Sequence, residues 1–192
     1  MTKTKIARII SDIFNGFLTM ILTPSIAIFT SPLPTTQKII LFILYLLSPI
    51  LPYLILRKMG KVTDYEFTNR KERPPYFTTI SLLFGILFLL ITTLNIEALT
   101  LTRVSLNIFL VSFVITLITF FWKISGHMTY STILFATLIY LFPTTPSLMF
   151  LFVLTPIIAW SRIVLNKHTL TQVILGTLIP LSISILIYWP FW

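Results

Sequence analysis

The residues of this chain best suited to chemistry are its two histidines, His127 and His168. Each follows a short polar segment: Lys123-Ile124-Ser125-Gly126-His127 in one case, and Ser161-Arg162 with five further residues before His168 in the other. An imidazole can act as a nucleophile, a general base or, once protonated, a general acid. Two such groups, each with a serine and a cation nearby in sequence, predict a site for an anionic substrate.

The second segment predicts phosphoryl transfer. Gln172 lies four residues after His168, a spacing that places two side chains on one face of a helix. Its carbonyl can accept the Nδ1 proton, which leaves Nε2 as a nucleophile or base. Arg162 carries a planar guanidinium that suits phosphate oxygens. Together these residues favour a reaction through a phosphohistidine.

The first segment supplies further phosphate ligands. Gly126 lets backbone N–H groups approach an anion at a helix start, Ser125 adds a donor, and His127 can protonate a leaving oxygen. Lys123 can bind phosphate or extend its ammonium to the membrane surface, and the sequence leaves both interpretations open. Three cations of the polar stretch 57–75 could add positive charge: Arg70, Lys71 and Arg73.

The elements that must position these residues are membrane-spanning helices. Of 192 residues 56% are hydrophobic and only 10% are charged, against about 25% charged residues in soluble domains. Mean hydropathy is +0.97. There is no cysteine, so the sequence excludes disulfides and thiolate metal sites. Two histidines and five carboxylates offer few ligands for a metal, and no cofactor is expected.

The predicted fold is an all-α, polytopic bundle of six to seven membrane-spanning helices, forming a single domain over residues 1–192. A crossing needs roughly 20 apolar residues. The expected crossings are 8–30, 37–56, 76–96, 104–122, 127–143, 147–160 and 169–189. The fifth and sixth are short, which would place the histidines near the depth of the lipid headgroups.

The positive charge predicts an orientation. Seven crossings place the N-terminus, the 57–75 loop and both histidine segments on one side, together with twelve of the 14 Lys and Arg residues. Cytoplasmic loops carry the excess of Lys and Arg, so this side is expected to face the cytoplasm. The net charge of +9 does not indicate nucleic-acid binding, because the cations form no solvated face outside the 57–75 loop.

The ordered motifs resemble the type 2 phosphatidic-acid phosphatase superfamily. Ser125-Gly126-His127 is similar to its second signature, and Ser161-Arg162-x5-His168, followed by Gln172 to Gly176, is similar to its third. Arg73-Pro74 resembles the end of the first signature, K-x6-R-P. The resemblance implies a metal-independent lipid phosphatase with His168 as nucleophile and His127 as general acid. It also implies a phosphate-binding set of Arg73, Ser125, Gly126 and Arg162.

Three positions depart from the family pattern. Glu66 stands where the first signature has lysine, so Arg70, Lys71 or Lys123 would have to supply that charge. Ile124 replaces a proline. Gln172 replaces the aspartate that orients the nucleophilic histidine, and it can fix the tautomer of His168 but adds no negative charge. Asp64 or Glu72 could fold in to compensate.

Three functions remain open from the sequence. The first is hydrolysis of a lipid phosphate or prenyl diphosphate, with phosphorylated membrane lipids as substrate partners. The second is transfer of the phosphoryl group from the same histidine to another alcohol. The third is a non-catalytic lipid-binding or transport protein whose site lost its chemistry when Gln172 arose.

Overall fold

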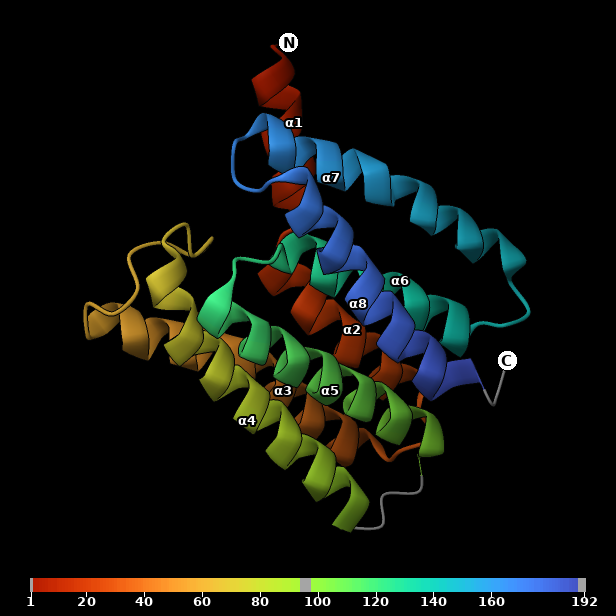
Figure 1. Cartoon of the computed structure of the whole chain (residues 1–192). Helices are drawn as coiled ribbons and strands as arrows, with labels where there is room; N and C mark the ends of the chain where they lie inside the picture. Colours follow the sequence, from red (N-terminus) through yellow and green to blue (C-terminus); the bar gives the residue numbers. More distant parts are fainter. Residues whose placement is uncertain (1, 94–97, 190–192) are drawn as a thin grey trace. The chain divides into compact units, whose positions relative to one another are not determined.

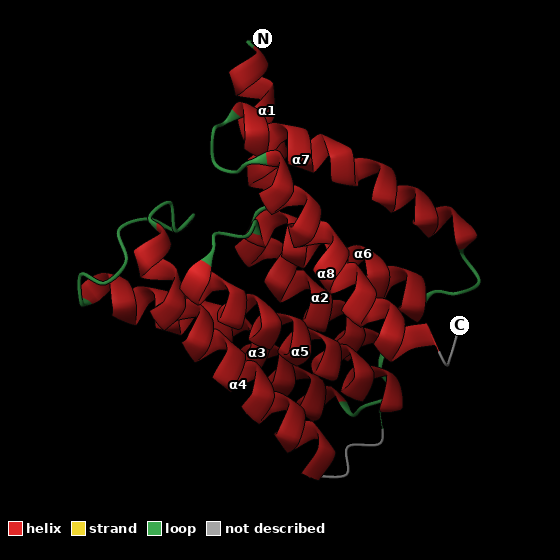
Figure 2. Ribbon diagram, in the orientation of Figure 1, coloured by secondary structure: helices red, strands yellow, loops and turns green. Residues whose placement is uncertain are grey.

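The structure is a computed structural model that describes residues 2–93 and 98–189, and within these ranges it contains helices and no strand (Figures 1 and 2). The elements are α1 (Lys3–Ile13), α2 (Gly16–Thr30), α3 (Thr35–Lys58), η1 (Arg70–Glu72), α4 (Arg73–Thr93), α5 (Leu99–Phe121), α6 (Gly126–Leu141), η2 (Pro146–Val153), α7 (Leu154–Val164) and α8 (Leu170–Tyr188). The predicted all-α fold is confirmed. The last residues of the expected crossing 76–96 lie outside the described ranges.

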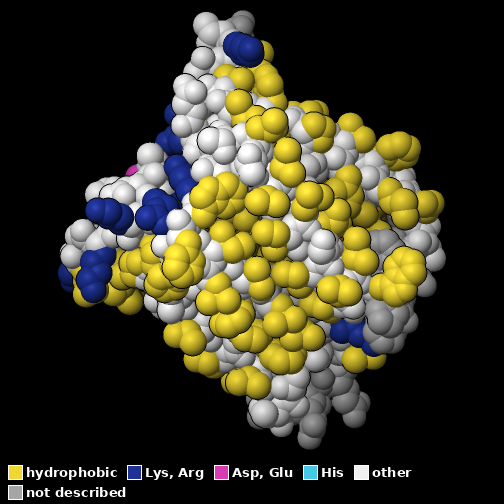
Figure 3. Space-filling model, in the orientation of Figure 1, with side chains coloured by type: hydrophobic (Ala, Val, Ile, Leu, Met, Phe, Trp, Pro, Cys, Tyr) yellow, Lys and Arg dark blue, Asp and Glu magenta, His cyan; other side chains and the backbone are white. Residues whose placement is uncertain are grey.

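Six segments of the described chain are long and apolar enough to cross a membrane: 3–30, 35–58, 70–93, 99–121, 146–164 and 170–188. Large apolar side chains remain exposed along them. On α4, for example, Leu82, Ile86 and Leu89 are each about 60% exposed (63%, 58% and 58%), and Figure 3 shows a face covered largely by hydrophobic side chains. Lipid tails solvate such a surface as water cannot, so the chain is a multi-pass membrane protein.

The first expected crossing is not one continuous helix. α1 ends at Ile13 and α2 begins at Gly16, where the Asn15 side-chain oxygen accepts from the backbone N–H of Phe17 at 2.8 Å. Asn and Gly favour helix ends over helix interiors, so this short pair of residues divides the segment. α1 is therefore a separate helix, and it packs against α7.

The fifth crossing is short, as predicted, but the sixth is not. α6 has 16 residues, or about 24 Å at 1.5 Å per residue. The expected 147–160 segment instead runs from Pro146 to Val164, because a 3-10 helix of eight residues precedes the 11 residues of α7. At about 2.0 Å and 1.5 Å per residue these add up to roughly 32 Å, enough for the hydrocarbon core.

The chain divides into two compact units: Met1–Thr23 with Lys123–Trp192, and Pro24–Trp122. In the first unit α6 packs against α7, α8 and η2, and α1 packs against α7. α6 is its core helix, with most of its residues buried. In the second unit α4 packs between α3 and α5, and the Tyr45 hydroxyl of α3 donates to Ser105 of α5 at 2.8 Å. The single domain over 1–192 stays a prediction.

Candidate active site

The predicted pairing of His168 with Gln172 is present in the structure. The His168 Nδ1 and Gln172 Oε1 atoms are 2.9 Å apart. The backbone N–H of Thr169 donates to the same Oε1 atom at 3.3 Å, which identifies that atom as the carbonyl oxygen, because an amide NH₂ cannot accept. Nδ1 must therefore carry a proton, and in the neutral imidazole Nε2 then holds the lone pair.

This contact comes from a helix cap rather than from a shared helix face. His168 lies before α8, and Thr169 is the N-cap residue, whose hydroxyl accepts from the Gln172 backbone N–H at 3.4 Å. Gln172 reaches back to the N-cap backbone, so the two residues form a capping box. The expectation that both side chains stand on one helix is corrected. The carbonyl of Gln172 serves the cap and the histidine together.

The five residues between Arg162 and His168 contain the C-terminal end of α7 and the turn that leads to α8. Arg162 lies in the last turn of α7, whereas the expected crossing 147–160 would have ended before it. The Lys167 N–H donates to the Arg162 carbonyl at 3.0 Å and the Asn166 N–H to Ile163 at 2.9 Å. Asn166 has a φ of 53°, the left-handed conformation that asparagine tolerates best after glycine. This is a Schellman motif, and it ends α7 just before His168.

Arg162 and His127 meet around a residue that no motif contains. The Nη1 atom of Arg162 lies 3.3 Å from Nε2 of His127. Both contact the hydroxyl of Ser11 in α1: Nη1 donates to Ser11 Oγ, which lies 3.3 Å from His127 Nε2. Arg162, His127 and Ser11 are buried. The sequence interpretation missed Ser11, and its only signal was a small polar residue on an amphipathic helix.

The starts of α6 and α8 are joined directly. The Ser125 N–H donates to the backbone carbonyl of Gln172 at 3.4 Å. A Cβ on Gly176 would lie 3.1 Å from the Ser125 carbonyl oxygen and 3.1 Å from Met128 Cβ, so glycine is what allows α8 to approach this closely. Gly176 thus lets α8 pack against the segment that contains Ser125.

Ser125 and Gly126 open helix α6. Ser125 is its N-cap, with Oγ 3.5 Å from the Met128 N–H, and it is fully buried. Gly126 has no positive φ, and no atom lies within 4 Å of a Cβ placed on it. A side chain at position 126 would therefore meet open space, and the N-terminus of α6 beside it is a place that suits an anion. Lys123 is half-buried in the segment before Ser125.

The cations of the polar loop belong to the other unit. Arg73 is buried and donates from Nε to the Phe67 carbonyl at 2.9 Å, and exposed Arg70 donates to the Phe120 carbonyl at 2.9 Å, near the end of α5. Lys71 is exposed. Arg73 and Arg70 thus hold the loop against its own unit, and a role in phosphate binding stays a prediction for all three.

The two carboxylates considered as substitutes for the family aspartate are engaged in that loop. Glu72 accepts from the backbone N–H of Thr63 at 2.8 Å, and Asp64 accepts from that of Glu66 at 2.8 Å. Each therefore shapes a turn of the loop. In the residues that the structure describes, no group of three or more histidine or carboxylate side chains is placed to hold a metal ion.

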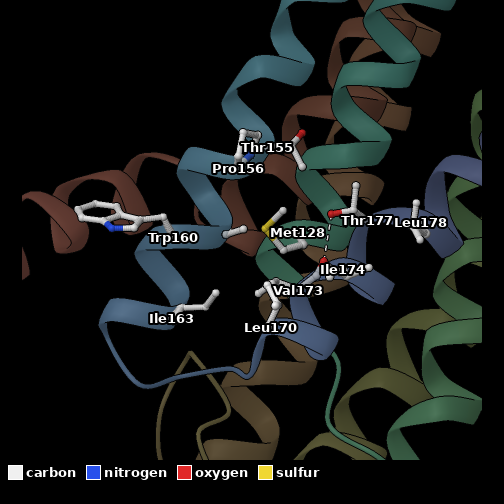
Figure 4. A pocket seen from close by; sticks show the side chains of 11 residues that line it. Met128, Thr155, Pro156, Trp160, Ile163, Leu170, Val173, Ile174, Thr177 and Leu178 are labelled. Carbon is white, nitrogen blue, oxygen red and sulfur yellow. Dashed lines mark hydrogen bonds between the residues drawn. The ribbon is translucent and has the colours of Figure 1, made fainter.

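An apolar cavity of about 460 Å³ adjoins these residues within the first unit (Figure 4). Its lining comes from α6, α7 and α8: Met128, Thr155, Pro156, Ala159, Trp160, Ile163, Leu170, Val173, Ile174, Thr177 and Leu178. Met128 follows His127, Ile163 follows Arg162, and Leu170 comes two residues after His168. Its volume lies within the roughly 300–1,000 Å³ of small-molecule pockets.

The fold and these contacts together define a multi-pass helical membrane protein with a buried cluster of histidine and arginine. Residues 118–192 match the family model of the PAP2 superfamily. This segment contains both histidines, Arg162 and Gln172, so the match supports the resemblance to this superfamily that the motifs show. Members of the superfamily are phosphatases, which supports a phosphoric-ester hydrolase. No curated protein and no solved structure matches the chain significantly.

Proposed function

We propose that the protein is an integral-membrane lipid phosphatase that hydrolyses a lipid phosphate or prenyl diphosphate through a phosphohistidine, without a metal. The observation that carries the proposal is the 2.9 Å contact between His168 Nδ1 and Gln172 Oε1. It places the ring proton of the neutral imidazole on Nδ1, so that Nε2 carries the lone pair that a nucleophile requires.

The reaction has two steps. In the first, His168 Nε2 attacks the terminal phosphorus, and the bond from this phosphorus to the leaving oxygen breaks. The leaving group is the lipid alcohol from a lipid phosphate or the prenyl monophosphate from a prenyl diphosphate, and His127, in its protonated form, gives its oxygen a proton. In the second, water attacks the phosphohistidine and inorganic phosphate leaves, while His127 takes up the proton from water. Arg162, Ser125 and the open N-terminus of α6 at Gly126 would bind the phosphate oxygens. Arg73, Arg70, Lys71 and Lys123 would add positive charge.

The apolar cavity favours a lipid over a soluble phosphate ester. Its lining is apolar apart from two threonines, and three of its residues are near sequence neighbours of Arg162, His127 and His168. Of the two threonines, Thr177 donates from its hydroxyl to the Val173 carbonyl of its own helix at 3.1 Å, as Figure 4 shows. Thr155 Oγ1 is already buried without a hydrogen-bond partner among the described residues, so a hydrocarbon chain that fills the cavity breaks no hydrogen bond of its lining.

Phosphate release by the purified protein tests the proposal. The panel contains phosphatidic acid, a prenyl diphosphate and a soluble aryl phosphate, all with EDTA present. We expect release from at least one lipid, and a loss of at least about 10²-fold in kcat for His168→Ala and for His127→Ala. Equal release by wild type and His168→Ala would sink the proposal.

Two further measurements separate the alternative functions. Radioactive phosphate trapped on the protein during turnover, and absent from His168→Ala, indicates a phosphohistidine. Products formed with added lipid alcohols distinguish a transferase from a hydrolase. Tight substrate binding with no trapped label and no phosphate release would favour a non-catalytic lipid-binding protein.

Two matched variants test whether the cavity binds a lipid chain. Ile174→Trp places a large side chain at the lining of the cavity, whereas Leu186→Trp changes an exposed position (76% exposed) on the same helix outside the lining. We expect Ile174→Trp to lower kcat/KM about tenfold for a long-chain substrate and much less for a short-chain one. Equal effects of the two variants would contradict a chain-binding cavity.

A further inference from the structure

Helix α1 brings a buried hydroxyl to the point where two site residues converge. Ser11 Oγ accepts a hydrogen bond from Arg162 Nη1 and lies 3.3 Å from His127 Nε2, and Nη1 and Nε2 are themselves 3.3 Å apart. The three atoms thus form a closed triangle. Ser11 is 0% exposed, so water does not compete for these contacts.

The position of Ser11 follows from how α1 packs. Ala7 and Ser11 are one helical turn apart, both are 0% exposed, and α1 packs against α7, the helix of Arg162. Two small side chains at this spacing allow two helices to approach closely. Ile6, Ile9 and Ile13, by contrast, stay exposed on α1.

A serine hydroxyl suits this point because it both accepts and donates. Arginine can only donate, so Ser11 Oγ is the acceptor toward Arg162. The single hydroxyl proton can then go to His127 Nε2 when the imidazole is neutral. When His127 is protonated, Oγ can accept from Nε2–H instead. The same residue therefore orients His127 in both protonation states that a general acid passes through.

We propose that Ser11 is a positioning residue of the phosphate site. It holds the Arg162 guanidinium and the His127 imidazole beside one another, with Nη1 3.3 Å from Nε2, so that a phosphate ester bound by the guanidinium would have an oxygen close to the imidazole that protonates it. The inference rests on the proposed phosphatase function and adds the N-terminal helix to the site. Ser11 lies outside the segment 118–192 that matches the family.

Three variants test the role of the hydroxyl. Ser11→Ala removes it, Ser11→Thr keeps it, and Ser131→Ala is the matched control. Ser131 lies one turn after His127 in α6, is 1% exposed, and its Oγ has no hydrogen-bond partner among the described residues. Each alanine variant thus loses one buried oxygen, but only Ser11→Ala loses hydrogen bonds.

We expect Ser11→Ala to lower kcat/KM for the hydrolysed lipid by about tenfold to a hundredfold, with both a lower kcat and a higher KM. Ser11→Thr should stay within about threefold of wild type, and Ser131→Ala should not change the kinetics. A purely structural role predicts the reverse order, because alanine fits a tight helix contact and the added methyl group of threonine does not. That reverse order, or wild-type kinetics for Ser11→Ala, would overturn the proposal. If Ser11→Ala does not fold, Ser11→Cys, which keeps the size but has a weak donor, should show the same loss.

A binding measurement separates two outcomes: that Ser11 has no positioning role, and that the protein is not a phosphatase. If wild type hydrolyses no substrate, inorganic phosphate serves as the probe, and its protection against thermal unfolding in detergent is measured. Protection of wild type and Ser131→Ala, but not of Ser11→Ala, would support Ser11 in a phosphate site that lacks catalysis. Equal protection of all three, or none for wild type, would overturn the role of Ser11.

Discussion

Gln172 Oε1 lies 2.9 Å from His168 Nδ1 and at the same time accepts from the Thr169 backbone N–H. Gln172 thus orients the histidine through a helix cap. The carbonyl fixes the tautomer of His168 as an aspartate would. It does not supply the negative charge that stabilises an imidazolium.

Two substitutions at Gln172 separate orientation from charge. Gln172→Glu keeps the length and the acceptor oxygens and adds a negative charge, so we expect kcat equal to or above that of wild type. Gln172→Leu removes the acceptor and should lower kcat by at least about 10²-fold. Steady-state kinetics on the best lipid substrate measure both. Wild-type kcat for Gln172→Leu would show that the contact does not serve catalysis.

Substitution of two glycines should give opposite results. Gly126→Ala puts a methyl group into the open space in front of α6, so we expect unchanged stability, because alanine suits a helix, and about tenfold lower kcat/KM if phosphate binds there. Gly176→Ala puts a methyl group 3.1 Å from the Ser125 carbonyl oxygen and should cost about 1–3 kcal/mol of stability. Thermal unfolding and phosphate release, measured on both variants, test the pair. The prediction fails if Gly126→Ala is as active as wild type.

The turn between Arg162 and His168 depends on the conformation of Asn166. Its φ of 53° suits glycine, so Asn166→Gly should retain both stability and activity. Asn166→Val should cost about 1–2 kcal/mol, because a β-branched residue rarely adopts this conformation. Since His168 follows two residues later, we also expect lower kcat. Chemical denaturation and kinetics measure these effects, and equal behaviour of the two variants would contradict this account of the x5 spacing.

The proposed cytoplasmic orientation of the site can be tested by labelling. The chain has no cysteine, so a single cysteine at Met59, which is 57% exposed at the end of α3, is the only target for a thiol reagent. In intact cells an impermeant maleimide should not label Met59→Cys, whereas a permeant one should. Labelling of intact cells by the impermeant reagent would place this loop, and by the predicted topology the site, on the outer face.

The sequence alone determined the class of fold, the two histidine motifs and the Gln172 acceptor. Long apolar segments must form helices in a bilayer, since backbone groups find no water there. The four-residue spacing brings Gln172 within reach of His168 whether it lies in a helix or in a cap. These features are local in sequence, so composition and spacing suffice to predict them.

Only the tertiary structure decided which residues meet across the first unit. Ser11 and Arg162 are separated by 151 residues, and nothing local in either segment predicts that α1 packs against α7. The extension of the sixth segment by a 3-10 helix also depends on packing, because short apolar runs do not specify helix type. Gly176 likewise needs the Ser125 carbonyl beside it to explain its identity. These features depend on contacts between segments that are far apart in the sequence, and residue spacing within one segment does not predict such contacts.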